Sequence, residues 1–235
     1  MNAVWAAFDA TWPAVEYATA GAFRVARGTG AGERVRSAVP VSDPTLDDIA
    51  QAEAAHRRWG QPALFRVMAD DAALRDALIA RGYRRHDGAL LMTAPVAALT
   101  DQALPPVTAI PVWPPLAIQR DLWDAGDFGP ARRDVMARVA GDKVSILGRI
   151  NDRAAGTAFV GHHDGVVMVH ALIVLPEFRR SGLAGWMMRQ AAFWGAERGA
   201  SQVALAVGTG NIAARALYDG LGFQVAGAYD YLMRD

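Results

Sequence analysis

The sequence of 235 residues contains no cysteine, which excludes disulfide bonds, thiolate metal sites and a cysteine nucleophile. It also lacks net charge, because 24 lysines and arginines balance 24 aspartates and glutamates. Lys143 is the only lysine, so the positive charge is almost entirely arginine. Without a large basic field, nucleic acids and acidic membrane surfaces are not expected as partners.

Long apolar runs are missing as well, since no stretch approaches the ~20 residues that span a bilayer. The apolar segment 1–23 is interrupted by Asp9, Pro13 and Glu16 and has no basic start, so it does not resemble a signal peptide. We therefore expect a soluble, cytoplasmic protein. What the sequence does contain is 52% apolar residues, enough to build the core of one large domain or two small ones.

Prolines concentrate in residues 94–115, which hold six of the twelve in the chain. Proline removes an amide donor and restricts the residue before it, so this stretch is typical of a linker or a sheet edge. We predict a domain over residues 1–97, a Pro-rich linker over 98–115 and a second domain over 116–235.

The second domain alternates between helical and strand periodicity. The pattern predicts a helix, three strands, a helix, a strand, a helix and a final hairpin that turns at Ala226-Gly227. His162 and His163 are expected in a turn that ends in Asp164-Gly165. This order predicts a mixed α/β (α+β) fold with one central sheet. The expected ranges are 122–139, 144–150, 154–160, 166–175, 183–198, 203–207, 211–221 and 223–233.

The first domain partly repeats the second. Residues 73–83 resemble 213–223, with the paired glycines offset by 222 − 82 = 140 positions, and residues 63–67 match 203–207 at the same offset. The ordered matches indicate an internal duplication with a diverged first copy. The alternative is a chance similarity between two amphipathic helices that both end at glycine.

A strand–turn–helix segment in the second domain has the features of an anion site. An apolar strand runs into Pro176, then the arginine pair Arg179-Arg180 and Gly182, and then a helix. The first helical amides have no internal partners and the helix dipole places positive charge there, while glycine allows close approach. The fixed-spacing glycines of dinucleotide and P-loop motifs are absent, so those two folds are not indicated.

The same segment resembles the Arg/Gln-x-x-Gly-x-Gly/Ala signature of the GNAT acetyltransferase superfamily, with Arg179, Gly182 and Ala184 at the matching positions. The resemblance implies a sheet of the acyl-CoA N-acyltransferase type, here as two GNAT-like units in tandem, and no metal. It implies that the turn binds the pyrophosphate of acetyl-coenzyme A and that the preceding strand pairs with its pantetheine arm. The residues involved would be Leu172, Ile173, Val174, Arg179, Arg180, Ser181, Gly182, Leu183, Ala184 and Gly185.

A second block, Asn211-x-x-Ala214-x-x-Leu217-Tyr218, is similar to the second coenzyme-binding block of the family. Helical periodicity sets Asn211, Arg215 and Tyr218 on one face. The resemblance implies that they face the coenzyme and that Tyr218 protonates the departing thiolate. From the residues alone, Asn211 is also a good helix N-cap and Tyr218 a core aromatic with a solvated hydroxyl.

The residue that accepts the proton of the attacking amine is less well marked. Many family members carry a glutamate on the strand before the turn, where this sequence has Met168. His170 lies two residues on, on the same strand face, and its intrinsic pKa is near working pH, so it is the candidate base. A half-buried histidine bonded to a neighbour is an equal alternative. Glu177 and Asp230 are further candidates.

The first domain lacks this chemistry. Leu78 stands at the position of Tyr218, and residues 40–45 have no arginine–glycine turn, so no coenzyme is expected there. Asp43 and Thr45 are expected as helix caps. Trp12, Trp59 and Trp113 are expected to fill cores; the alternative is that they line an acceptor pocket.

Together these features predict an acetyl-CoA-dependent N-acetyltransferase. Its acceptor would be a small-molecule amine, an amino acid or a peptide N-terminus, and the protein a monomer or homodimer. The alternatives are a catalytically silent acyl-CoA-binding sensor and a transferase of a different acyl group.

Overall fold

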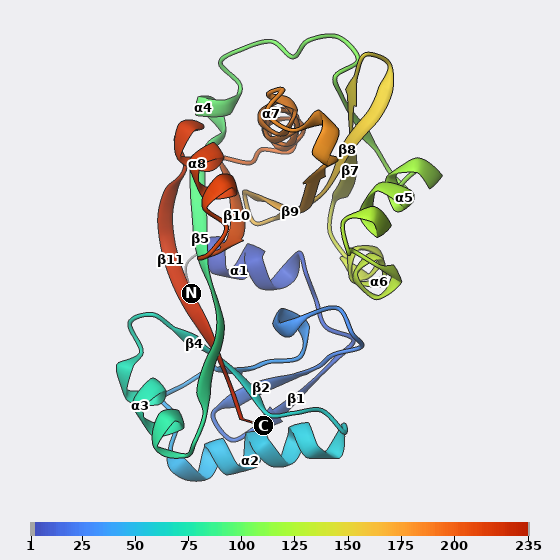
Figure 1. The fold of residues 1–235 in the computed structure, drawn as a ribbon. Coiled ribbons are helices and arrows are strands. Elements are labelled where there is room, and N and C mark those ends of the chain that lie inside the picture. The colour runs from blue at the N-terminus through green and yellow to red at the C-terminus, as the bar shows by residue number, and fades with distance from the viewer. Residues whose placement is uncertain (1–2, 235) are drawn as a thin grey trace. The chain divides into compact units, whose positions relative to one another are not determined.

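The computed structural model describes residues 3–234, which form two compact units (Figure 1). Unit 1 comprises residues 3–12, 91–207 and 211–226, and unit 2 comprises residues 13–90, 208–210 and 227–234. The division falls within two strands, β5 (Arg84–Pro95) and β11 (Gln224–Met233). No helix in the described part of the chain is both long enough and apolar enough to cross a bilayer.

Unit 1 contains a mixed sheet in the order β5-β10-β9-β8-β7-β6. The strands β6 to β9 pair antiparallel to one another, whereas β9 and β10 run parallel, as predicted for a mixed α/β sheet. Besides β5, the helices and strands of this unit are α1 (Ala3–Ala10), α4 (Val96–Leu99), β6 (Ala109–Val112), α5 (Ala117–Ala125), α6 (Pro130–Arg138), β7 (Lys143–Ile150), β8 (Arg153–His163), β9 (Val166–Val174), η2 (Pro176–Phe178), α7 (Leu183–Ala196), β10 (Gln202–Gly208) and α8 (Ile212–Gly220).

The prediction of a single helix over residues 122–139 is wrong, because the chain forms α5 and α6 there instead. Residues 126–129 separate them: Gly126 ends α5, and Gly129 precedes Pro130, which occupies the first turn of α6. Glycine stops a helix and proline at the first helical position starts one, so the sequence carried the signal for the break.

The prediction of a final hairpin is also wrong, since β11 is one strand from Gln224 to Met233. Its residues Tyr229 to Met233 pair antiparallel with β4 (Leu64–Met68) in unit 2. Gly227 does not adopt the positive φ that a tight hairpin turn needs, so the alternating pattern continues through it.

The turn between β8 and β9 is shorter than expected. His162 and His163 are strand residues of β8, and only Asp164 (φ 46°) and Gly165 (φ 75°) make the turn. Positive φ at both central residues is the geometry of a two-residue hairpin, so Asp-Gly was the decisive signal. The described residues contain no cluster of three His, Asp or Glu side chains that could hold a metal.

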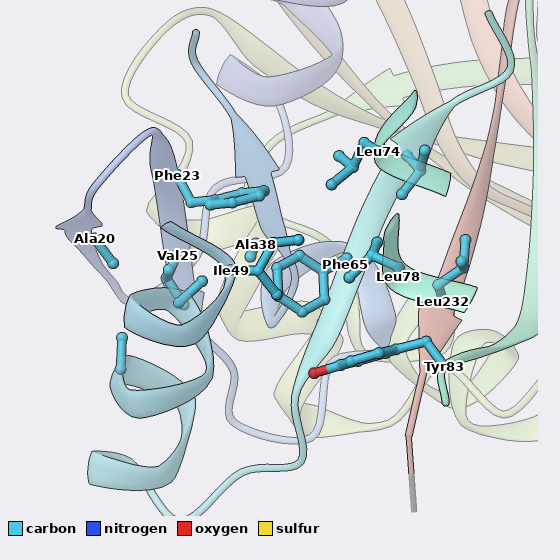
Figure 2. Close-up of a cluster of buried hydrophobic side chains, with 13 residues drawn as sticks. Ala20, Phe23, Val25, Ala38, Ile49, Phe65, Leu74, Leu78, Tyr83 and Leu232 are labelled. Carbon is cyan, nitrogen blue, oxygen red and sulfur yellow. The ribbon is translucent and has the colours of Figure 1, made fainter. Parts of the chain in front are cut away.

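Unit 2 places its strands in the order β1-β2-β3-β4-β11. Its elements are β1 (Glu16–Ala20), β2 (Phe23–Arg27), η1 (Glu33–Val35), β3 (Ala38–Pro40), α2 (Leu46–Arg58), β4 and α3 (Ala72–Ala80). Thr45 caps α2 in a capping box with Asp48, as expected for Thr45 but not for Asp43. Figure 2 shows the core of this unit, in which Phe65 of β4 and Leu232 of β11 come together with Tyr83, which lies between α3 and β5.

The compact units differ from the predicted ranges 1–97, 98–115 and 116–235. The end of β11 lies beside β4 in unit 2, and α1 packs on β8 and β9 in unit 1. Within the Pro-rich stretch, β6 pairs with the edge of β7. A sheet edge tolerates proline because amides on its outer side need no partner.

The helices α3 and α8 begin alike, as expected for two copies. Asp71 caps α3 with φ −87° and ψ 74°, and Asn211 caps α8 with φ −85° and ψ 72°. Each side chain accepts a hydrogen bond from the amide three residues on, from Leu74 at 3.0 Å and from Ala214 at 3.1 Å. This identity of geometry supports the internal duplication.

The ends of the two helices match as well, but one position between them differs. Gly82 (φ 86°) and Gly222 (φ 83°) terminate α3 and α8 in the left-handed conformation. Leu78, fully buried in unit 2, stands where unit 1 has Tyr218. The first copy therefore keeps the helix geometry and lacks the phenol.

Four of the five tyrosines are buried, namely Tyr83, Tyr218, Tyr229 and Tyr231, and burial is the largest cause that raises the pKa of each phenol. A folded-state pKa above the unfolded value of ~10 contributes stability that is intact below pH ~10 and lost as pH rises further. We expect alkaline unfolding above pH ~10, with each buried phenol contributing up to about 1.4 kcal/mol per pH unit.

Circular dichroism and tyrosinate absorbance recorded on the same samples test this expectation. The four buried phenols should ionise together with loss of the fold. Tyr83→Phe should move the unfolding midpoint to higher pH, whereas Tyr17→Phe should leave it in place. Ionisation of all the tyrosines with an intact circular dichroism spectrum would contradict the argument.

Candidate functional site

The parallel strands β9 and β10 of unit 1 separate part of the way along. Their paired residues run from Val166 and Gln202 to Val169 and Leu205, and no pair follows among the described residues. On its other edge β9 stays paired with β8 as far as Val174. Residues 171–174 therefore have one backbone edge that β10 does not occupy.

The separation begins at a β-bulge in β9. Phe159 pairs with His170, but Thr157 pairs with Ile173, so β9 holds one extra residue opposite β8. Ala171 in the bulge has φ 49°, which is uncommon for a residue with a side chain. The bulge changes the direction of the strand where the candidate site begins.

Trp123 of α5 stabilises the bulge through a hydrogen bond. Its side chain is fully buried, and its indole Nε1 donates a hydrogen bond of 2.9 Å to the carbonyl oxygen of Ala171. Sequence reasoning did not single out this residue. The available signal was that a buried tryptophan needs a hydrogen-bond acceptor for its N–H.

We expect Trp123→Phe to lower the free energy of unfolding by about 1–3 kcal/mol, because the carbonyl of Ala171 loses its donor inside the protein. Trp194→Phe is the control, as Trp194 is also buried but lies on α7 away from the bulge. Urea unfolding of both variants measures the difference, and equal losses would argue against a special role for Trp123.

The open edge of β9 presents the backbone of Leu172 and Val174. The amide of Leu175 bonds to the carbonyl of Ala155 on β8 at 2.9 Å. Because successive residues of a strand alternate in direction, Ile173 also points to β8, whereas Leu172 and Val174 point the other way. These are the two positions that the resemblance assigned to pairing with an extended ligand.

The turn after β9 leads into α7 with two left-handed residues. Arg180 has φ 61° and Gly182, the N-cap of α7, has φ 82°. The turn is held internally, since Arg179 Nε donates to the carbonyl of Val174 at 3.2 Å and Ser181 Oγ donates to that of Phe178 at 2.7 Å. A left-handed N-cap is unusual, and glycine adopts it without a steric penalty.

The start of α7 is an exposed group of backbone donors. Gly182 supplies no side-chain cap, so the first amides of Leu183, Ala184 and Gly185 have no helical partners. Arg179 and Arg180 are exposed beside them. Donors, helix dipole and guanidinium groups together favour a doubly charged anion such as a pyrophosphate.

Helix α8 lies close to this turn. A Cβ added to Gly185 would be 3.9 Å from Leu221 Cδ2, just beyond the end of α8. Tyr218 is the buried residue of α8, and burial raises its pKa to about 12. Asn211 is exposed and uses its side-chain oxygen as the N-cap, and Arg215 is partly exposed.

His170 lies immediately before the bulge and is 8% exposed. Its Nε2 is 2.8 Å from the hydroxyl oxygen of Thr11, and its ring lies 5.0 Å from that of Trp12 and 6.0 Å from that of Phe159. The histidine is therefore fixed by neighbours. Thr11 and Trp12 come from the start of the chain, which sequence reasoning had given to the other domain.

The other proton acceptors considered are placed differently. Glu177 is exposed in η2, before the turn. Asp230 belongs to unit 2, where its carboxylate pairs with Arg85 at 2.9 Å. Among the three candidates, His170 alone lies next to the bulge on the strand with the open edge.

A mixed sheet whose parallel strands part beside a turn rich in backbone donors defines the acyl-CoA N-acyltransferase type of fold. Residues 113–223 match the acetyltransferase (GNAT) family, and this part of the chain belongs to that family. No curated protein matches the sequence.

Solved structures share the fold over nearly the whole chain. A GCN5-related N-acetyltransferase from Kribbella flavida has a TM-score of 0.75 at 17% identity, covering 99% of this chain and 95% of its own. A functionally unknown conserved protein from Staphylococcus epidermidis has a TM-score of 0.69 at 13% identity, covering 96% and 95%.

A tandem GNAT protein from the clavulanic acid biosynthesis pathway has a TM-score of 0.63 at 14% identity, covering 90% of this chain and 78% of its own. The predicted fold class, two GNAT-like units in tandem, is thereby confirmed.

Proposed function

We propose that this chain is an acetyl-CoA-dependent N-acetyltransferase that acetylates a primary amine by direct attack in a ternary complex. The observation that carries the proposal is the separation of β9 from β10 beside the donor-rich start of α7. The open edge at Leu172 to Val174 would pair with the pantetheine arm. The segment Arg179 to Gly185 would hold the pyrophosphate, and Asn211 and Arg215 of α8 would line the same site.

The reaction needs three functions from the chain. The neutral amine nitrogen attacks the thioester carbon, the C–S bond breaks, and the sulfur leaves with the bonding electron pair. The amide of Leu172, which points away from β8, would stabilise charge on the carbonyl oxygen. His170 would take the proton from the amine, and Tyr218 would give a proton to the sulfur.

The raised pKa of Tyr218 refines its role. A phenol with a pKa of about 12 stays protonated throughout the working pH range, so the donor form is always present. It is a weaker acid than a thiol, whose pKa is ~8.5. Tyr218 would therefore donate a hydrogen bond as negative charge grows on sulfur, and the proton would follow as the C–S bond breaks.

Release of free thiol from acetyl-coenzyme A, measured with a panel of small amines, amino acids and peptides, tests the proposal. We expect thiol release that requires an amine and forms the acetylated product. Tight binding of acetyl-coenzyme A without thiol release from any amine would favour a regulatory acyl-CoA sensor. Turnover with longer acyl thioesters and not with acetyl-coenzyme A would reassign the transferred group.

A further inference from the structure

Thr11 connects the start of the chain to the candidate base. It follows α1 and is fully buried, 159 positions away from His170 in sequence. Its hydroxyl oxygen is 2.6 Å from the carbonyl oxygen of Ala7 and 2.8 Å from Nε2 of His170. All three residues belong to unit 1.

These two distances determine where the protons are. A hydroxyl group has one hydrogen, and a carbonyl oxygen can only accept a hydrogen bond. The hydroxyl of Thr11 must therefore donate to Ala7, which leaves its lone pairs for His170. A hydrogen bond between Thr11 and the ring then requires Nε2 to carry the hydrogen, and in the neutral ring the lone pair is on Nδ1.

We infer that Thr11 is a positioning residue that fixes His170 in the Nε2–H tautomer, so that Nδ1 is the atom that accepts the proton. The role of His170 as the base rests on the proposed function. The tautomer of its ring does not depend on that function. Loss of the Thr11 hydroxyl removes the acceptor that holds the hydrogen on Nε2, and only the tautomer with that hydrogen has its lone pair on Nδ1.

The same contacts also suit the ring after it has taken a proton. The bond from Nε2–H to Thr11 and the bond from Thr11 to Ala7 both persist when Nδ1 gains a hydrogen. Ala7 lies near the carboxyl end of α1, where the helix dipole places partial negative charge that favours a cation. The aromatic rings of Trp12 and Phe159, 5.0 Å and 6.0 Å away, restrict rotation of the imidazole.

The tautomer can be read directly by nitrogen NMR of the full chain labelled with ¹⁵N-histidine. The chain has five histidines, and His170→Ala identifies the signals of His170 by their loss. We expect the unaltered protein to show the hydrogen on Nε2. In Thr11→Val, which keeps the shape and removes the hydroxyl, we expect the hydrogen to redistribute between the nitrogens. Thr11→Ser, which keeps the hydroxyl, should show the same His170 signals as the unaltered protein.

Kinetics provide the second readout. Thr11→Val should lower kcat about tenfold, which is less than the ~100-fold minimum for loss of the base itself, because His170 is still present; the Kd for acetyl-coenzyme A should change little. Thr11→Ser should recover most of the loss. A hydrogen on Nδ1 in the unaltered protein, or an unchanged tautomer in Thr11→Val, would overturn the inference. The expected tautomers without turnover of any amine would uphold the positioning and refute the proposed reaction.

Discussion

Tyr218→Phe is expected to lower kcat at least 100-fold, the usual minimum for loss of a positioned acid, while the Kd for acetyl-coenzyme A changes by less than about threefold. The substitution removes one oxygen atom and leaves the ring packed 5.8 Å from that of Phe223. No hydrogen bond of this hydroxyl to another described residue is seen, so its removal leaves no protein donor or acceptor without a partner. The fold should therefore remain intact.

Burst and steady-state measurements of thiol release with one good amine would separate binding from chemistry. Tyr17→Phe is the matched control, because Tyr17 is exposed and belongs to unit 2. The pH–rate profile adds a second check: with a pKa of about 12, Tyr218 should produce no alkaline limb below pH ~10, the range in which the fold is expected to stay intact. Unchanged turnover in Tyr218→Phe would remove this residue as the acid.

Local sequence signals predicted most of the sheet. Asp164-Gly165 marked the hairpin between β8 and β9, and Gly182 and Gly222 marked a helix start and a helix end. The two wrong elements, the single helix over 122–139 and the final hairpin, came from places where a local pattern has more than one outcome. The break between α5 and α6 depended on weighing Gly129-Pro130 against helical periodicity, and β11 depended on whether Gly227 turns.

The candidate site was only partly within reach of the sequence. The turn at Arg179 to Gly185 and the helix with Tyr218 are local motifs, so their positions could be predicted. The contacts of Trp123 with Ala171 and of Thr11 with His170 join residues 48 and 159 positions apart. Such contacts depend on the tertiary fold: a buried tryptophan indicates that an acceptor is needed, but one sequence without its fold does not identify the partner.

Gly182→Asp is expected to weaken binding of acetyl-coenzyme A about 100-fold, a loss of roughly 2.7 kcal/mol. Position 182 has φ 82°, a conformation that aspartate tolerates better than most residues, and only Trp186 Nε1 comes within 4 Å of an added Cβ. The new carboxylate would lie beside the first amides of α7. It would repel a pyrophosphate and compete with it for the same donors.

Gly199→Asp provides the control at the other end of α7. Gly199 has φ 74° and nothing within 4 Å of an added Cβ, so the backbone strain is similar. Titration calorimetry should show weaker binding of acetyl-coenzyme A to Gly182→Asp only. Acetyl-pantetheine, which lacks the pyrophosphate, should bind equally to both variants and to the unaltered chain, because its contacts with β9 are untouched.

The stability of the two variants should move in the opposite sense to their affinity. A carboxylate at the start of a helix is favoured by the helix dipole, and one at the end is disfavoured. Gly182→Asp should therefore melt no earlier than Gly199→Asp, although it binds the coenzyme far more weakly. Equal affinity in both variants would show that the donors at the start of α7 do not hold the pyrophosphate, and the site would then have to lie elsewhere along the open edge of β9.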